Sequence, residues 1–210
     1  MRMVVERIAG GPWGANCYAV HDENAVLLVD PGGDPGDILA ALEERSLGLV
    51  GMVATHGHFD HVAGAAAISE LVGVPLWISR ADDRILAAGN LHSLATGYGQ
   101  PVTRPVVLED LDGVGTTLTV GPFELGVLVT PGHTPGSRCL LVGDALFTGD
   151  TLLARGAVDS PLPGADAAGL RASLDLLATS LDSDVVTVYP GHGRSCGLGD
   201  ALTAAKSENA

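Results

Sequence analysis

The sequence predicts an α/β protein with a single domain over residues 1–210, and three observations lead to this expectation. The chain has 210 residues, of which 46% are hydrophobic, so it can bury a substantial core. Short apolar runs alternate with amphipathic stretches, and an order of strands followed by a helix occurs twice. No low-complexity segment or linker interrupts the chain.

The first half of the chain is predicted to alternate between strands and helices. Strands are expected at residues 3–8, 17–21, 25–30, 49–54 and 75–78. Asp34 is the expected N-cap of a helix that runs to Ser46, and further helices are expected at 62–72 and 81–88. Residues 89–104, which include Tyr98 and Arg104, are predicted to form an irregular loop that either covers a pocket or is a plain surface insertion.

The second half repeats this order. Strands are expected at residues 116–120, 123–130, 138–142, 145–148 and 185–189. The third and fourth of these are predicted to pair as a hairpin around Gly143-Asp144. Helices are expected at 165–181 and 198–206.

Histidines and carboxylates follow the C-terminal ends of several predicted strands. Three of the seven histidines fall in one loop, Thr55-His56-Gly57-His58-Phe59-Asp60-His61. His133 and His192 lie in turns rich in glycine and proline, and Asp150 follows an apolar run. A single histidine is more often a core or surface residue, but imidazole and carboxylate groups clustered in this way are typical metal ligands. Because strands hold rigid positions, the sequence predicts that these groups converge on a metal site.

Composition and charge limit the kinds of molecule that this protein is expected to act on. The formal net charge is −14, from 25 acidic and 11 basic residues, and no basic cluster is present, so a nucleic-acid substrate is not expected. No apolar run approaches the ~20 residues of a membrane span, and the N-terminus lacks a signal peptide. The three cysteines define no disulfide framework. We expect a cytoplasmic protein that acts on a small molecule; the oligomeric state is left open.

In the order of its ligand candidates, the chain resembles the metallo-β-lactamase-fold hydrolases. The resemblance rests on His56, His58, Asp60 and His61, followed by His133, Asp150 and His192, and extends over essentially the whole chain. It implies a four-layer αβ/βα sandwich of two mixed β-sheets flanked by helices, with metals at one edge. The segments at 131–137 and 147–152 are similar to the glyoxalase II-related (hydroxyacylglutathione hydrolase-like) branch, and Asn16-Cys17-Tyr18 and Asp30-Pro31-Gly32 also resemble elements of the superfamily.

The resemblance also implies a role for each ligand. His56, His58 and His133 would hold one metal, Asp60, His61 and His192 would hold the second, and Asp150 would bridge both. Asp60 and Asp150 are the candidate catalytic residues. Two Zn²⁺ ions per chain are expected, with iron or manganese as the alternatives.

The ligand set has a chemical consequence of its own. Two cations a few Å apart can lower the pKa of a shared water from about 15.7 toward 7, and the resulting hydroxide would attack an acyl carbonyl. We therefore expect a dinuclear hydrolase of a thioester or related small acyl substrate, with no serine or cysteine nucleophile. Asp30 is either a hydrogen-bond partner of a ligand histidine or a residue that opens the Pro31-Gly32 turn.

Two departures from the glyoxalase II pattern concern the substrate. The C-terminal helical extension of glyoxalase II is not expected after His192, and Asp159 stands about where relatives that use glutathione carry a basic residue. Arg155 is a possible substitute for that residue. Asp150 stands where zinc β-lactamases usually carry cysteine or serine, which argues against β-lactam hydrolysis.

Other functions share this motif. A persulfide dioxygenase would hold one iron through His56, His133 and Asp150. A lactonase or phosphodiesterase would differ only in its pocket. A binding protein with purely structural metal is less expected, because structural zinc sites are usually closed by four protein ligands. His21 and His92 lie in no ligand-bearing turn, so their replacement by alanine is expected to be nearly neutral, although His92 could contact substrate from the loop.

Overall fold

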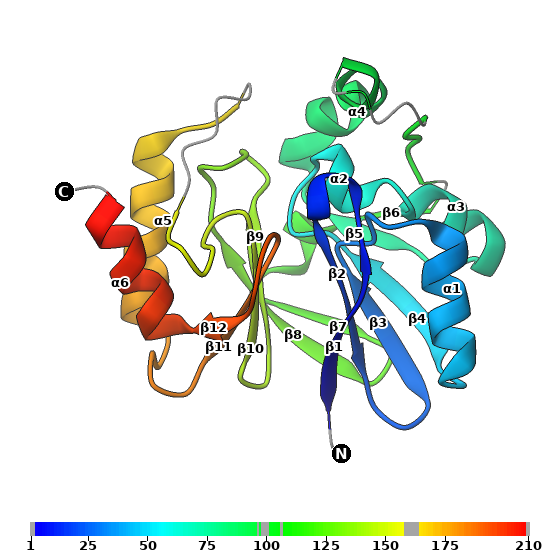
Figure 1. The fold of residues 1–210 in the computed structure, drawn as a ribbon, viewed down its shortest axis with the longest axis horizontal. Helices are drawn as coiled ribbons and strands as arrows, with labels where there is room; N and C mark the ends of the chain where they lie inside the picture. The colour runs from blue at the N-terminus through cyan, green and yellow to red at the C-terminus, as the bar shows by residue number, and fades with distance from the viewer. Residues whose placement is uncertain (1–2, 96, 98–100, 106, 158–163, 209–210) are drawn as a thin grey trace.

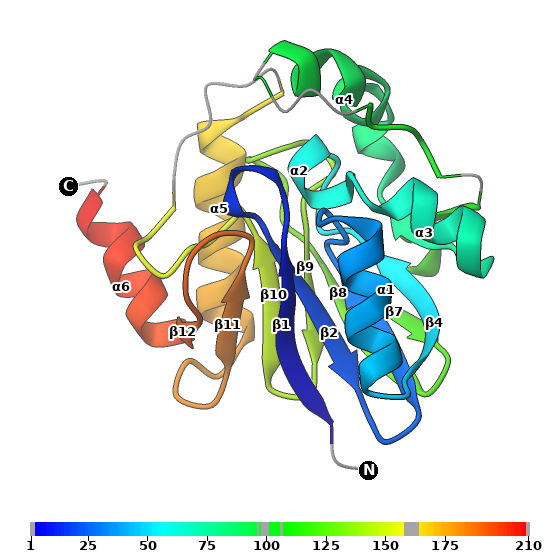
Figure 2. The ribbon, with the colours of Figure 1, turned by 45° about the vertical axis from the view of Figure 1, so that its right-hand side comes forward.

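Two six-stranded sheets face each other, and helices cover the outer face of each (Figures 1 and 2). This arrangement is seen in a computed structural model that describes residues 3–95, 97, 101–105, 107–157 and 164–208. Helices α1 and α3 lie on one outer face, and α5 and α6 lie on the other. The expected mixed sheets flanked by helices are therefore confirmed.

The first sheet has the strand order β1-β2-β3-β4-β5-β6. Its first three strands pair antiparallel, and β3 to β6 pair parallel. The strands are β1 Val4–Gly10, β2 Asn16–His21, β3 Ala25–Val29, β4 Gly48–Val53, β5 Leu76–Ile78 and β6 Leu108–Asp110.

The second sheet has the order β12-β11-β10-β9-β8-β7, and only β10 and β11 pair parallel. Its strands are β7 Thr117–Val120, β8 Phe123–Val129, β9 Arg138–Val142, β10 Ala145–Gly149, β11 Thr187–Pro190 and β12 Cys196–Gly197. The helices are α1 Pro35–Glu44, α2 Phe59–Val62, α3 Ala65–Val72, α4 Asp83–Ala95, α5 Ala167–Ser180 and α6 Leu198–Glu208, with 3-10 turns at Pro12–Gly14, Arg80–Asp82 and Leu111–Val114.

Three hydrophobic clusters fill the three spaces between the four layers. One contains Val29 and Phe147 and lies between the sheets, one packs the first sheet against α1 and α3, and one packs the second sheet against α5 and α6. Alternation along the strands produces this division. In β10, for example, Phe147 belongs to the cluster between the sheets, whereas Leu146 belongs to the cluster under the helices.

Several predicted elements differ from those observed. The helix expected at 62–72 is instead the end of α2, at Val62, followed by α3, which begins at Ala65; between them the Gly64 N–H donates to the Pro31 carbonyl at 3.0 Å. The prediction of a loop at 89–104 is wrong for residues 89–95, which form the end of helix α4. Strands β6 and β12 were not expected, because each has only two or three residues.

Other expectations are confirmed. Asp34 caps α1 by accepting hydrogen bonds from the backbone of Gly36 and Asp37. Strands β9 and β10 form the predicted hairpin, in which Val142 pairs with Ala145. Among the helices of the described residues, none has the length and apolar character that a membrane crossing requires.

Candidate metal centre

The candidate ligands converge because they follow strand ends at one edge of the two sheets. The His56–His61 loop follows β4 of the first sheet. His133, Asp150 and His192 follow β8, β10 and β11 of the second sheet, respectively. The convergence predicted from strand ends is therefore present, and the site draws on both sheets.

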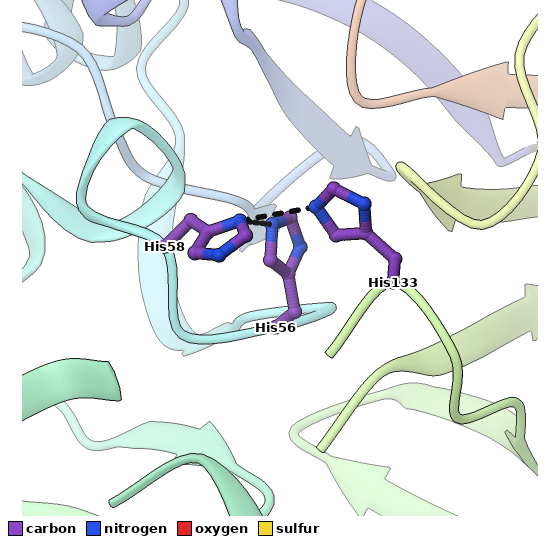
Figure 3. A group of neighbouring side chains, drawn as sticks. All are labelled: His56, His58 and His133. Atoms are coloured by element: carbon purple, nitrogen blue, oxygen red, sulfur yellow. Dashed lines mark hydrogen bonds between the residues drawn. The ribbon is translucent and has the colours of Figure 1, made fainter. Parts of the chain in front are cut away.

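The first group consists of His56, His58 and His133, all three buried (Figure 3). The Nδ1 atom of His58 lies 3.1 Å from Nε2 of His56 and 3.0 Å from Nε2 of His133. Figure 3 shows the three rings turned toward one another, with His133 entering from a different segment than the other two. Three imidazole nitrogens this close can share one cation.

The second group consists of Asp60, His61 and His192. Asp60 and His61 lie in α2, and Asp60 Oδ2 lies 3.6 Å from His61 Nε2 and 3.3 Å from His192 Nε2. Two imidazoles and a carboxylate are again a typical ligand set for a divalent metal.

Asp150 lies between the two groups. Its Oδ2 atom is 3.5 Å from Nε2 of both His133 and His192, and its Oδ1 atom is 3.6 Å from Nε2 of His61. It also forms a possible ligand set with His56 and His61. Gly191 makes this approach possible, because a Cβ at that position would lie 2.2 Å from Asp150 Oδ1.

Electrostatics favour neutral imidazoles in the first group. Burial lowers the pKa of His56 well below its ordinary value, lowers that of His58 to about 4 and lowers that of His133 to about 3. Repulsion from the neighbouring histidines acts in the same direction. A neutral imidazole is the form that donates a lone pair to a metal.

In the second group, nearby carboxylates have the larger effect on the pKa values of the histidines. Burial alone would lower the pKa of His61, but Asp60, Asp150 and Asp30 outweigh it and raise that pKa to about 10. A hydrogen bond with Asp60 similarly raises the pKa of His192. Without a metal, His61 therefore keeps a proton at neutral pH, and a bound cation would take the place of that positive charge among the carboxylates.

The residues present fit a metal. Within the described part of the chain, His61 Nε2, His133 Nδ1 and Asp150 Oδ1 are buried without a hydrogen-bond partner, and the first and last of these face the other ligand candidates. Unpaired buried polar atoms are costly, so a cation at this position would satisfy groups that are otherwise unsatisfied. A metal-binding site of histidine and aspartate residues is therefore present.

Asp30 holds the ligand loop in position. Its carboxylate accepts hydrogen bonds from the backbone N–H and the hydroxyl of Thr55, at 2.7 and 2.8 Å, and lies 3.0 Å from His61 Nδ1. This contact orients His61 through the ring nitrogen that faces away from Asp60 and Asp150. Of the two roles considered for Asp30, the structure supports that of histidine partner.

Asp82 was not identified from the sequence, although it connects two ligand loops. Its buried carboxylate accepts hydrogen bonds from the Gly57 backbone at 2.8 Å, from the Thr134 hydroxyl at 2.8 Å and from the Gly136 backbone at 2.6 Å. These donors flank His56 and His133. Nothing in the local sequence around Asp82 indicates this role, since it reads as an ordinary residue at a helix start.

Asn16 holds the third ligand turn. Its side-chain amide donates to the carbonyl oxygens of Pro190 and Gly193, at 2.9 and 3.0 Å, and its backbone N–H donates to Gly191. These bonds surround His192. The Asn16-Cys17-Tyr18 segment, noted above only as a resemblance, therefore has a structural role.

A cavity of about 270 Å³ opens onto the ligand groups. It is lined by Trp13, His58, Phe59, Asp60, His92, Ala95, His133, Asp150 and His192. His92 lies in helix α4, not in a loop, and it reaches this cavity. Arg104 instead pairs with Asp83 at 2.6 Å, and Tyr98 and Asp159 lie outside the described residues.

Comparisons with known proteins give consistent results. Residues 10–192 match the Metallo-beta-lactamase superfamily. The chain is 31% identical over 189 residues to the probable metallo-hydrolase YqgX of Bacillus subtilis, with 89% of each chain covered. It is 30% identical over 202 residues to the hydroxyacylglutathione hydrolase GloC of Haemophilus influenzae, with 94% of each chain covered.

Solved structures share the whole fold. The BLEG-1 B3 metallo-β-lactamase superposes with a TM-score of 0.84 at 28% identity, over 95% of this chain and 97% of that one. TTHA1623, in a di-iron-bound form, superposes with a TM-score of 0.82 at 31% identity, over 93% and 96% of the two chains.

Replacement of Asp82 should loosen the metal centre. In wild type, Gly57, Thr134 and Gly136 donate hydrogen bonds to the Asp82 carboxylate. In Asp82→Asn, an amide NH₂ group, which cannot accept these bonds, replaces one carboxylate oxygen, so the two ligand loops lose their common anchor. We expect metal affinity to fall by about 10- to 100-fold, as for other residues that orient ligands. Competition with a chromophoric chelator measures this, with Asp83→Asn as the control on an adjacent, more exposed carboxylate. Equal affinities in the two variants would contradict the role given to Asp82.

Proposed function

The chain belongs to the metallo-β-lactamase superfamily, and we propose that it is a metal-dependent hydrolase that cleaves a thioester or a related small acyl substrate. The observation that carries this proposal is the pair of ligand groups, with Asp150 within 3.6 Å of members of both. Two such groups beside one cavity support chemistry at a polarised carbonyl.

We assign one metal to each group. His56, His58 and His133 would hold the first ion, Asp60, His61 and His192 would hold the second, and Asp150 would contact both. Two zinc ions are our expectation, since zinc prefers imidazole and carboxylate ligands. Iron suits the same ligands, and a relative of this chain has been solved in a di-iron-bound form.

When bound, the ions would polarise the substrate carbonyl and lower the pKa of a water molecule. Hydrolysis then adds that water across the acyl C–S bond: a C–O bond forms, the C–S bond breaks, and the thiolate takes up a proton. Asp60 and Asp150 are the carboxylates that face the cavity, so their Oδ atoms are positioned to accept the water proton. Trp13, Phe59 and Ala95 give the cavity an apolar wall that suits a small acyl group.

The cysteines support water as the nucleophile. Cys17 and Cys139 are fully buried, and burial raises the pKa of the Cys139 thiol to about 12. None of the three cysteines lines the cavity. A covalent route through cysteine is therefore disfavoured. The GloC relative, described as a hydroxyacylglutathione hydrolase, supports a thioester substrate.

Metal content and a substrate panel test this proposal. We expect elemental analysis to find two metal ions per chain and the metal-loaded protein to hydrolyse simple thioesters. The panel also contains a lactone, a phosphodiester, a persulfide and a β-lactam. One iron per chain with persulfide oxidation would identify a dioxygenase, and turnover of the β-lactam alone would identify a β-lactamase. Two metals without hydrolysis of any thioester or ester would refute the proposal.

Asp150 should be needed for both ions. In Asp150→Ala, both groups lose a shared carboxylate, so we expect metal content to fall toward zero. Activity should fall by more than the ~10- to 100-fold typical of residues that only orient ligands. Asp144→Ala, in the exposed β9–β10 turn, is the matched control. Full metal content in Asp150→Ala would rule out the shared role.

His92 should affect substrate binding, contrary to the neutral effect expected from the sequence. It lines the metal cavity, so His92→Ala should raise KM by roughly fivefold, about the effect of one moderate contact. His21→Ala is the control, since the His21 ring contacts the Asp22 carbonyl at the end of β2 and does not line the cavity, so this variant should stay within about twofold of wild type. Equal kinetics in the two variants would exclude His92 from the binding site.

A further inference from the structure

Arg138 is a buried arginine at the start of β9, directly after the turn that carries His133. It is 6% exposed, whereas every other arginine that the structure describes is exposed. Burial of a guanidinium group costs free energy unless the group is paired and hydrogen-bonded. Its Nε atom has no hydrogen-bond partner among the described residues. The partners of its other two nitrogen atoms therefore indicate what this burial provides.

One end of the guanidinium group binds the turn that carries His133. Its Nη1 atom donates hydrogen bonds to the Ser137 carbonyl at 2.8 Å and to the Pro135 carbonyl at 3.5 Å. The Asp82 carboxylate binds an O–H and an N–H group of the same turn. A cation therefore binds the carbonyl oxygens of this turn, and an anion binds its hydrogen-bond donors.

The other end of the guanidinium group connects this turn to the segment that contains Asp82. The Nη2 atom of Arg138 donates to Asp112 Oδ1 at 2.6 Å, and Asp112 Oδ2 accepts a hydrogen bond from the Ser79 hydroxyl at 2.8 Å. Ser79 is the N-cap of the 3-10 turn that ends at Asp82. Arg138 and Asp82 thus join the same two segments, and charge-assisted hydrogen bonds fix the geometry of both connections.

These contacts concern the first group of metal ligands, because the turn carries His133. The second group is held by Asp30 and Asn16 instead. The hydrogen bonds that the structure describes for the Arg138 side chain reach neither of these two residues. A change in this side chain should therefore affect the two ligand groups unequally.

We propose that Arg138 is a positioning residue of the first metal group. It binds the His133 turn and, through Asp112, the segment of Asp82, and so holds His133 at the distance from the His56–His58 loop at which three imidazoles can share one ion. This inference rests on the assignment of one metal to each ligand group in the proposed function. It concerns metal affinity and not the substrate.

Cadmium binding tests the proposal at each site separately. Metal-depleted protein is titrated with ¹¹³Cd²⁺ against a competing chelator, and NMR follows one resonance for each occupied site. His133→Ala and His192→Ala, each of which removes a ligand candidate of a single group, assign the resonances. In Arg138→Met, which keeps a long apolar side chain, the affinity of the first site should fall by about tenfold, the lower end for residues that orient ligands. The second site should stay within about twofold of wild type.

Arg45→Met is the matched control. It also removes an arginine that pairs with a carboxylate, that of Glu6 at 3.0 Å, but this pair is exposed and lies at the end of α1. Both sites should keep their affinity within about twofold. Equal weakening of the two sites in Arg138→Met would overturn the proposal. So would an unchanged first site, even with a lower Tm, because Arg138 would then support only the fold.

Asp112→Ala tests the same pair from its other side and serves if Arg138→Met does not fold. The Asp112 side chain is 34% exposed, so its removal leaves a smaller defect in the packing. The first site should again weaken selectively. The double variant Arg138→Met/Asp112→Ala should lose no more affinity than Arg138→Met alone, because the two side chains act through one connection. An unchanged first site in Asp112→Ala would contradict the role given to this pair.

Because the readout is metal affinity, it separates this proposal from the proposed function. Selective weakening of the first site in Arg138→Met supports the positioning role even if the protein hydrolyses no thioester. Conversely, thioester hydrolysis by wild type together with unchanged cadmium affinities in Arg138→Met would leave the proposed function standing and overturn the role of Arg138.

Discussion

The metal centre depends on holding together loops that belong to two different sheets, and the Asp82 carboxylate provides this connection. It accepts hydrogen bonds from both sides of the junction, from Gly57 after β4 and from Thr134 and Gly136 after β8. The sheets themselves contact through a hydrophobic cluster, which is non-directional and fixes their separation more than the position of their loops. Directional hydrogen bonds to a buried carboxylate add the precision that a ligand set needs.

Elsewhere in the site, too, side chains outside the two ligand groups hold the ligands in position. Asp30 orients His61 from the first sheet, and Asn16 fixes the turn that carries His192. Neither side chain belongs to the two ligand groups. The burial of these polar groups is tolerated because each finds partners, whereas some atoms among the ligands themselves remain unpaired among the described residues. The side chains that hold the ligands in place are therefore hydrogen-bonded, whereas the ligand candidates keep polar atoms that a cation could bind.

Local sequence patterns were enough to predict the ligand candidates and their convergence. Apolar runs identified β4, β8, β10 and β11, and a ligand candidate follows each one, so convergence at one sheet edge could be expected. Tertiary contacts changed other expectations. At the break between α2 and α3, the Gly64 N–H donates to the carbonyl of Pro31 in a distant turn, and the extension of α4 brings His92 to the cavity. Such contacts join distant segments and leave little trace in the local sequence.

The sequence by itself determined the chemistry of the ligands, because imidazole and carboxylate groups in strand-end loops have few other uses when clustered. It also determined the α/β class, through the order of its apolar strands and amphipathic helices, whereas the four-layer sandwich was expected from the family resemblance. Only the tertiary structure decided where Asp82 and Asn16 act and that His92 borders the cavity of the ligands. The reason is physical: these features are distances between segments far apart in the chain, and packing of the two sheets sets those distances.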